Sequence, residues 1–330
     1  MVTKNEIIKT VEDNASTLLS DDCVHISKIE IRQQKRLGFH VAVTQRFICL
    51  VRAVAKSGKE TRYDIFVKKG SNADAEYRKM VTLWSEHYFK QDKYLIPRPL
   101  FVDSQRSLLF TDYFVGENLV NLFYRRLLLR RDAAAFLDET VASAARWLAD
   151  FQSIHRSAHR IPVPSEMLGY ETNVGNLRML GDGDRKRIVG KANSAIRNCP
   201  RYPQTYVHGE YLPRNIIFRG EQICVVDFPD YRIGWPLYDV LRFLVGIDRL
   251  VQYPFISRSF CELAKARFVS EYIAQSHIEH EARTLENLWA PFVLTYVRRM
   301  YPRHKDIRGA LNDQFVSQVL RRLVSWSKAQ

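Results

Sequence analysis

Hydrophobic and polar residues alternate with a period near two over residues 23–69. The alternation is clearest in the segments VHISKIEIR, FHVAVTQRFICLVRAV and TRYDIFVKK, where β-branched and aromatic residues are frequent. The intervening AKSGKE has the composition of a turn. This pattern predicts an antiparallel β-meander.

A helical period replaces the alternation after Gly70, in the segment ADAEYRKMVTLWSEHYF, and Ser71 or Asn72 can cap this helix. The following IPRPLFVDSQRSLLFTDYFVGENL contains two short apolar strands, and helical periodicity dominates after Gly116. Amphipathic helices are predicted in DAAAFLDETVASAARWLADFQSIHRSAH, LYDVLRFLVGIDRLV and SFCELAKARFVSEYIAQSHIEHEA. The second part of the chain is therefore expected to be mainly helical.

The order of these elements indicates an α+β fold with two lobes. The N-terminal lobe, residues 1–112, is predicted to be a small antiparallel β-sheet with one long helix. The C-terminal lobe, residues 113–330, is predicted to be larger and mostly helical. We place the boundary between Thr111 and Gly116, because strands dominate before it and helices after it.

Composition places the chain among globular proteins, since 46% of its 330 residues are hydrophobic and 26% are charged. Its five cysteines include no CxxC pair, which argues against a disulfide framework or a zinc cage and favours a reducing cytoplasm. The N-terminus lacks the apolar core of a secretory signal, and no apolar run approaches the roughly 20 residues that a bilayer requires. We expect a cytoplasmic protein that does not span a membrane.

The chain is strongly basic, with 50 Lys and Arg against 36 Asp and Glu and a formal net charge of +14. Such an excess indicates an anionic partner such as a nucleotide, although dispersed Lys and Arg are also typical of a solvated surface. RNA binding through basic helices such as FYRRLLLRRD is a further alternative that would require a clustered positive face. The charge is spread along the chain, so we do not expect nucleic acid as the partner.

The stretch HGEYLPRNIIFRGEQICVVDF carries the residue types of phosphoryl transfer. That reaction needs a carboxylate to accept the proton of the attacking hydroxyl and oxygen ligands for Mg²⁺ on the nucleotide phosphates. Glu210, Asn215 and Asp227 are residues of these kinds. The apolar runs at 216–218 and 223–226 predict a hairpin that would bring Asn215 beside Asp227.

A lysine at the end of a predicted strand, Lys68, precedes a helix that carries Glu76. An ion pair between them would hold the lysine toward phosphate oxygens. Lys69 is an adjacent alternative, and a Lys–Glu pair is often only a surface contact. The link QQKRLG holds one glycine, Gly38, so a G-x-G-x-x-G phosphate loop is absent and basic side chains or a short turn must contact the phosphates instead.

Together HGEYLPRN, VVDF and GWPLYD resemble the aminoglycoside phosphotransferase and choline kinase superfamily. The pattern of that superfamily is His-Gly-Asp, four residues, Asn, then an Ile-Asp-Phe strand end and a later Asp. Lys68, Glu76 and the segments IPRPL, LLFTDYFVGENL and WLADFQSIH follow in the same order, so the resemblance covers about residues 41–239. It implies a two-lobed, protein-kinase-like fold with ATP, or another nucleoside triphosphate, and Mg²⁺ in the cleft.

The resemblance also implies roles for single residues. Glu210 would be the catalytic base, Asn215 and Asp227 the metal ligands, and Lys68 the nucleotide-phosphate lysine with Glu76 as its partner. Backbone groups would face the adenine at Thr111, Asp112, Tyr113 and Phe114. His208 and Asp239 would brace the catalytic loop.

One departure from the superfamily pattern is Glu210, which is one methylene longer than Asp. A misplacement of about 1 Å can cost on the order of a hundredfold in rate. Two functions therefore remain open: an ATP- and Mg²⁺-dependent phosphotransferase that acts on a small-molecule hydroxyl, or a catalytically weak, kinase-like nucleotide-binding or scaffold protein. The short interval between Asp227 and Asp239 leaves no room for a long activation segment, which disfavours a protein kinase.

The acceptor is less well defined by the sequence. A cationic aminoglycoside would need carboxylates in its pocket, and the candidates are Glu271, Glu279, Glu281 and Glu286, whose segment also has the pattern of a solvated helix face. The net charge of +14 favours a neutral or anionic acceptor such as a sugar, a nucleoside or a phosphorylated metabolite.

Overall fold

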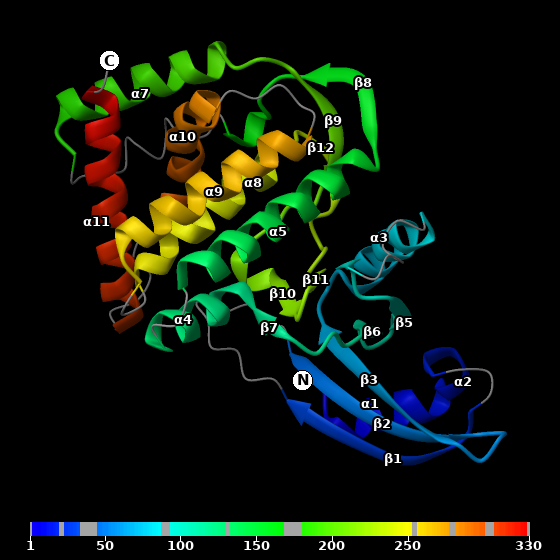
Figure 1. Cartoon of the computed structure of the whole chain (residues 1–330). Helices are drawn as coiled ribbons and strands as arrows, with labels where there is room; N and C mark the ends of the chain where they lie inside the picture. The colour runs from blue at the N-terminus through cyan, green and yellow to red at the C-terminus, as the bar shows by residue number, and fades with distance from the viewer. Residues whose placement is uncertain are drawn as a thin grey trace. The chain divides into compact units, whose positions relative to one another are not determined.

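The computed structural model describes residues 2–19, 23–33, 45–86, 93–129, 133–167, 180–252, 256–276, 282–300 and 307–328. The chain forms two compact units (Figure 1). The first unit comprises Met1–Glu117 and Ile217–Pro229, and the second comprises Asn118–Ile216 and Asp230–Gln330. The α+β prediction is confirmed, because antiparallel strands dominate the N-terminal region and helices the C-terminal one.

The first unit contains a five-stranded antiparallel sheet with the order β1-β2-β3-β6-β5. Its strands are β1 (Cys23–Gln33), β2 (Arg46–Ala55), β3 (Glu60–Lys69), β5 (Pro99–Asp103) and β6 (Leu108–Asp112). Every second side chain of β2 is buried, at Phe47, Cys49, Val51 and Ala53. This is the burial that a period of two requires of a sheet with one face on the core.

Two helices contribute to the core of the first unit, α1 (Lys4–Asp13) and α2 (Ala15–Leu18). The α1 helix begins with a capping box, in which the Thr3 side chain accepts from the Glu6 backbone N–H and the Glu6 carboxylate accepts from the Thr3 backbone N–H. Ile7 and Val11, one turn apart, are fully buried in the same core cluster as β2.

The predicted helix after Gly70 is α3 (Ala73–Ser85). Asn72 occupies the position before its first turn, but the Asn72 side chain makes no capping hydrogen bond; instead its backbone oxygen accepts from the Glu76 N–H at 2.9 Å. Glu76 lies on the buried face of α3 with Met80 and Leu83. A carboxylate in that position requires a partner, because buried charges are costly unless they are paired.

A second sheet has the order β4-β11-β10-β7, and most of its residues belong to the first unit. Its strands are β4 (Tyr94–Leu95), β7 (Glu117–Asn118), β10 (Ile216–Arg219) and β11 (Gln222–Val225). The predicted hairpin is confirmed as β10 and β11, with Gly220 at a φ of 58° in the turn between them. At Gly116 a Cβ would lie 2.5 Å from the Phe218 carbonyl oxygen, so this close approach requires glycine.

The second unit is built mainly from helices, and Figure 1 shows α5, α8 and α9 side by side. The helices are α4 (Leu119–Leu129), α5 (Ala133–Ser153), α7 (Asp182–Arg197), α8 (Leu237–Asp248), α9 (Arg258–Ser276), α10 (Ala282–Met300) and α11 (Ile307–Lys328). Short 3₁₀ turns occur at η2 (Ser165–Met167), η3 (Pro213–Asn215) and η4 (Arg249–Gln252). Large aromatic side chains fill the interior, including fully buried Trp147, Tyr211 and Phe268.

The predicted helix that contains Trp147 is shorter than the sequence indicated. It ends at Ser153, and RSAHRI forms β8 (Arg156–Ile161) in a three-stranded sheet with β9 (Tyr202–Val207) and β12 (Arg232–Gly234). His155 therefore lies past the helix and stacks on Tyr206, with ring centroids 5.0 Å apart. Pairing with β9 supplies the backbone hydrogen bonds that the helix would have made, and this long-range pairing leaves no trace in local periodicity.

None of the helices in the described ranges is both long and apolar enough to span a bilayer.

Candidate functional site

The loop after β9 is held by a buried carboxylate at the start of α8. Asp239 accepts hydrogen bonds from the backbone N–H groups of His208, at 2.7 Å, and Gly209, at 2.9 Å. Burial raises the pKa of Asp239 to about 7, although these two N–H groups act to lower it. The loop that follows β9 is thus anchored to α8 before it reaches Glu210.

Gly209 allows the sharp change of direction in this loop. Its φ is 84°, in the left-handed region, and a Cβ there would lie 2.5 Å from the Cβ of Asp230. Any other residue would carry both the backbone strain and the clash. The His-Gly pair of the motif therefore has a local structural cause.

The carboxylate of Glu210 is held by two arginines. Arg242, on α8, forms an ion pair with Oε1, and Arg214 lies 3.4 Å from Oε2 through its Nη2. The Arg242 side chain is only 9% exposed, whereas that of Arg214 is 41% exposed. Arg242 thus tethers one oxygen from the interior, and the contact with Arg214 is long and open to solvent.

Sequence analysis missed Arg242. The signal was present, since a single arginine interrupts the mainly apolar run LYDVLRFLVGID, of which every residue except Tyr238 is buried in α8. A charged residue is almost never fully buried unless it is paired, so an arginine at this position indicates a partner carboxylate elsewhere in the chain. The sequence does not show which one.

Asn215 closes the same loop. Its side-chain Nδ2 donates to the backbone oxygen of Glu210 at 2.9 Å, and the residue is almost entirely buried at the end of η3. This bond fixes the orientation of the amide, so Oδ1 is the atom that can act as a ligand. The structure thus brings Glu210 and Asn215 together in the second unit.

In the first unit, Lys68 contacts two carboxylates. Its Nζ lies 2.9 and 2.7 Å from the two oxygens of Glu76 and 2.7 Å from Oδ1 of Asp227. The three side chains are 12%, 6% and 13% exposed, so this is a buried cluster and not a surface pair. Lys68, at the end of β3, is the lysine that meets Glu76.

The charged groups of this cluster shift one another's pKa values. Burial acts to lower the pKa of Lys68, but the carboxylates of Asp227 and Glu76 outweigh it and raise this pKa above its usual value. Burial raises the pKa of Glu76, while the ammonium of Lys68 acts against that increase. Lys68 is therefore held as a cation.

Asp227 lies two residues beyond β11 in a strained backbone conformation. Its φ is 77°, and a non-glycine residue in the left-handed region costs on the order of 1–3 kcal/mol. Its second oxygen, Oδ2, accepts from Nη2 of Arg46 at 3.2 Å. Asp227 is thus fixed by two cations, and Arg46, the first residue of β2, is the second basic residue that sequence analysis missed.

The segment proposed to face adenine comprises the last two residues of β6 and the two residues after it. The backbone N–H of Asp112 donates to the Arg98 oxygen, and that of Tyr113 donates to the Asp64 oxygen, both at 2.9 Å. Thr111 is paired within the sheet, opposite Phe66 and Pro99. The N–H groups of Asp112 and Tyr113 are therefore already engaged within the protein.

Some predicted features fall outside the described residues, namely Gly38, Glu279 and Glu281. Of the remaining acidic residues, Glu271 is paired with Arg267 at 3.1 Å and lies 3.6 Å from Arg146. A carboxylate held in this way is not available to neutralise a cationic acceptor without losing these contacts.

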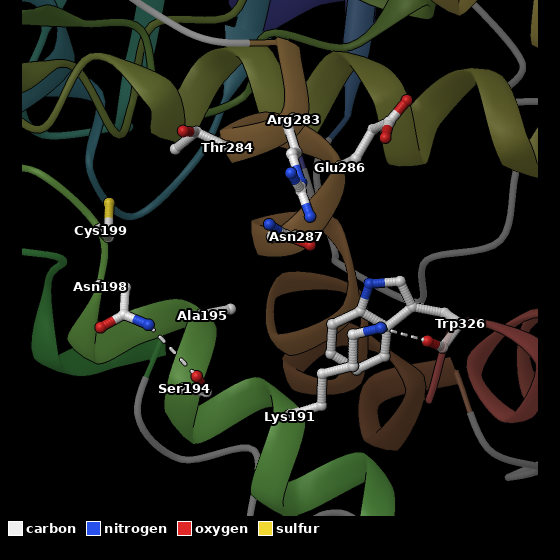
Figure 2. A pocket seen from close by; sticks show the side chains of 10 residues that line it. All are labelled: Lys191, Ser194, Ala195, Asn198, Cys199, Arg283, Thr284, Glu286, Asn287 and Trp326. Carbon is white, nitrogen blue, oxygen red and sulfur yellow. Dashed lines mark hydrogen bonds between the residues drawn. The ribbon is translucent and has the colours of Figure 1, made fainter. Parts of the chain in front are cut away.

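A cavity of about 320 Å³ lies in the second unit, between α7, α10 and α11 (Figure 2). Its lining includes Lys191, Asn198, Arg283 and Glu286 and the indole of Trp326. Lys191 donates to the backbone oxygen of Trp326 at 2.7 Å and lies over its ring. The lining residues do not come from the loop of Glu210, so a molecule bound there would not contact that carboxylate.

Comparison with known proteins identifies the class to which this arrangement belongs. The model of the phosphotransferase enzyme family matches residues 76–286, and the chain belongs to that family. This confirms the resemblance seen in the sequence. A search of curated protein sequences gives no match.

Solved structures with the same fold include three small-molecule kinases. A thermostable mutant of aminoglycoside phosphotransferase APH(4)-Ia, in complex with ADP and hygromycin B, has a TM-score of 0.56 and 14% identity, with 97% of this chain and 99% of that chain covered. Choline kinase from Cryptosporidium parvum Iowa II has a TM-score of 0.54 and 10% identity, with 98% and 95% covered. Amicoumacin kinase hAmiN, in complex with AMP-PNP, Ca²⁺ and Ami, has a TM-score of 0.52 and 11% identity, with 97% and 96% covered. At these identities the likeness shows the fold alone.

Proposed function

We propose that this protein is an ATP- and Mg²⁺-dependent phosphotransferase that phosphorylates a hydroxyl group of a small molecule. The observation that carries the proposal is the buried cluster in which Lys68 contacts both Glu76 and Asp227. A buried lysine between two carboxylates, with a family model that matches 76–286, fits a nucleotide-phosphate site. The proposal includes lobes of 1–112 and 113–330 and a cytoplasmic location.

The residues present fit a bound nucleotide and metal. Lys68 would contact phosphate oxygens, Glu76 would keep it oriented, and peptide groups of Thr111–Phe114 would contact the adenine. Asn215 and Asp227 offer an amide and a carboxylate oxygen, the hard ligands that Mg²⁺ takes when phosphates and water complete its coordination. The metal, when bound, would neutralise charge on the transferred phosphoryl group.

Glu210 is the proposed catalytic base. Its carboxylate would accept the proton of the acceptor hydroxyl while the hydroxyl oxygen forms a bond to the γ-phosphorus, and the bond from that phosphorus to the β–γ bridging oxygen breaks to release ADP. Glu210 is one methylene longer than Asp, and we propose that the ion pair with Arg242 compensates for this extra length. The pair draws one carboxylate oxygen toward α8 and so limits where the other oxygen can lie.

The acceptor that fits this loop is neutral or anionic. Arg242 and Arg214 both contact the Glu210 carboxylate, so the surroundings of the proposed base are cationic. A cationic acceptor would meet like charge here, whereas a sugar, nucleoside or phosphorylated metabolite would not. The hygromycin B in the structure of APH(4)-Ia is a ligand of that protein and does not identify the acceptor of this one.

One observation favours a catalytically weak, nucleotide-binding protein as the second candidate. Each oxygen of the Glu210 carboxylate contacts an arginine, and these contacts compete with an acceptor hydroxyl for the carboxylate oxygens. The phosphotransferase proposal requires the long contact with Arg214 to open when the acceptor binds. The weak-kinase alternative requires it to persist.

Two measurements distinguish the candidates. ATP consumption is screened against hydroxyl acceptors with and without Mg²⁺, and thermal unfolding is followed with ATP under the same conditions. The proposed enzyme consumes ATP only with acceptor and Mg²⁺, and Asp227→Ala abolishes turnover. Full activity in Asp227→Ala contradicts the site assignment, and Mg²⁺-dependent stabilisation by ATP without turnover supports the weak-kinase alternative.

A further inference from the structure

The inference concerns Arg46 and rests on the proposed function. Arg46 opens β2 and lies opposite Lys68 in the register of β2 and β3. Directly opposed residues of antiparallel strands project from the same face of the sheet, and like charges in that position are destabilising. Two largely covered cations, 19% and 12% exposed, therefore lie side by side, and an anion is needed to offset their repulsion.

Asp227 supplies that anion in this structure. Its Oδ1 accepts from Lys68 Nζ at 2.7 Å and its Oδ2 from Arg46 Nη2 at 3.2 Å. With Glu76 the cluster has two cations and two carboxylates, which balance. A divalent cation bound at Asp227 would add two positive charges and compete with Arg46 and Lys68 for its oxygens, so both side chains would need another anion nearby.

The guanidinium of Arg46 has a donor available for a further anion. Its Nε is buried and has no hydrogen-bond partner within the described part of the chain, and the whole side chain is only 19% exposed. A buried donor without a partner is uncommon and calls for an explanation. A guanidinium fork matches a phosphate with two parallel N–H···O bonds, which an ammonium cannot make.

We propose that Arg46 is a second phosphate-binding cation, which moves from Asp227 to the β- and γ-phosphate oxygens of the nucleotide when the metal binds. Lys68 and Arg46 then hold the phosphate chain together. This assigns to a side chain the phosphate contacts that a glycine-rich loop would make through its backbone. Arg46 is a binding residue in this proposal and takes no part in proton transfer.

The test is the dependence of affinity on the number of phosphates. Binding of ATP, ADP and AMP in Mg²⁺ buffer is measured by calorimetry for the wild type, Arg46→Met and Arg46→Lys. We expect Arg46→Met to weaken ATP about tenfold to a hundredfold, a loss typical of charge-assisted bonds, while AMP changes by less than about twofold. Arg46→Lys keeps the charge without the fork, so a smaller loss confined to ATP and ADP is expected.

Arg52 provides the matched control, since it lies on the same strand but its side chain is 57% exposed and contacts Glu60. Arg52→Met should leave all three affinities unchanged. Equal weakening of ATP and AMP by Arg46→Met would assign Arg46 a structural role and overturn the inference, as would unchanged affinities for all three nucleotides. If Arg46→Met does not fold, Arg46→Lys decides by the same ratio. A wild type that binds none of the nucleotides contradicts the proposed function itself.

Discussion

Replacing Arg242 with methionine would remove the tether of the proposed base while keeping most of the side-chain volume in α8. The ion pair joins an arginine that is 9% exposed to a glutamate that is 24% exposed. Breaking a fully buried pair costs about 3–5 kcal/mol, whereas a surface pair is worth about 0–1 kcal/mol. Because the residue left behind, Glu210, can reach water, we expect a loss of about 1–3 kcal/mol in the free energy of unfolding.

The effect on turnover should be larger than the effect on nucleotide binding. A positioned general base contributes about 10²- to 10⁴-fold, and a displacement of about 1 Å costs on the order of a hundredfold. We expect Arg242→Met to lower kcat about ten- to a hundredfold with the KM for ATP unchanged. The assay is steady-state ADP formation with a saturating acceptor, and Arg214→Met, which removes only the long solvent-exposed contact, is the control.

Two further variants test whether Arg242 acts through Glu210. In Glu210→Gln the base is absent, so adding Arg242→Met should cause little further loss, and the two effects should not multiply. Glu210→Asp restores the residue of the superfamily pattern but withdraws the carboxylate from Arg242, so we expect lower activity. Multiplicative losses, or an Asp variant as active as the wild type, would refute the positioning role of Arg242.

Three other predictions follow from the same contacts. Gly209→Ala should lower the free energy of unfolding by about 2 kcal/mol or more, measured by denaturant unfolding, because the φ of 84° and the contact with Asp230 both penalise a Cβ; an unchanged midpoint would contradict this. Lys68→Ala should weaken ATP binding and lower the melting temperature, since it leaves the carboxylates of Glu76 and Asp227 without their shared cation; unchanged calorimetric affinity would exclude Lys68 from the nucleotide site. Burial raises the pKa of Asp239 from 3.8 to about 7, so the contribution of Asp239 to stability is greatest below pH 3.8 and is lost as the pH rises through about 7. The free energy of unfolding of the wild type should therefore fall relative to that of Asp239→Asn between pH 4 and about 7. A difference between the two proteins that does not depend on pH would contradict the shifted titration.

Local patterns in the sequence were enough for the elements that depend on local physics. The alternation over residues 23–69 predicted antiparallel strands, of which β2 is one, and the two apolar runs after Asn215 predicted β10 and β11. Each of these depends on a period of two and on short turns, which neighbouring residues determine. The family pattern around His208 is also local, because it includes Gly209, whose backbone conformation favours glycine.

Contacts between distant residues were not predictable in this way. The end of α5 at Ser153 depends on the pairing of β8 with β9, and the roles of Arg46 and Arg242 depend on carboxylates 181 and 32 positions away. A buried arginine in the apolar α8 indicates that a partner exists, but only the folded chain identifies Glu210 as that partner. Sequence analysis therefore proposed the candidate carboxylates Glu210 and Asp227 but missed the arginines that contact them.

The most direct test of the account is the transfer itself. Purified protein is incubated with ATP, Mg²⁺ and a neutral or anionic hydroxyl acceptor identified by the screen, and ADP and phosphorylated acceptor are quantified together by mass spectrometry. The account predicts equal amounts of both products, none without Mg²⁺, and a near-complete loss of both with Asp227→Asn. ADP formation in the absence of any phosphorylated acceptor, or full transfer by Asp227→Asn, would contradict it.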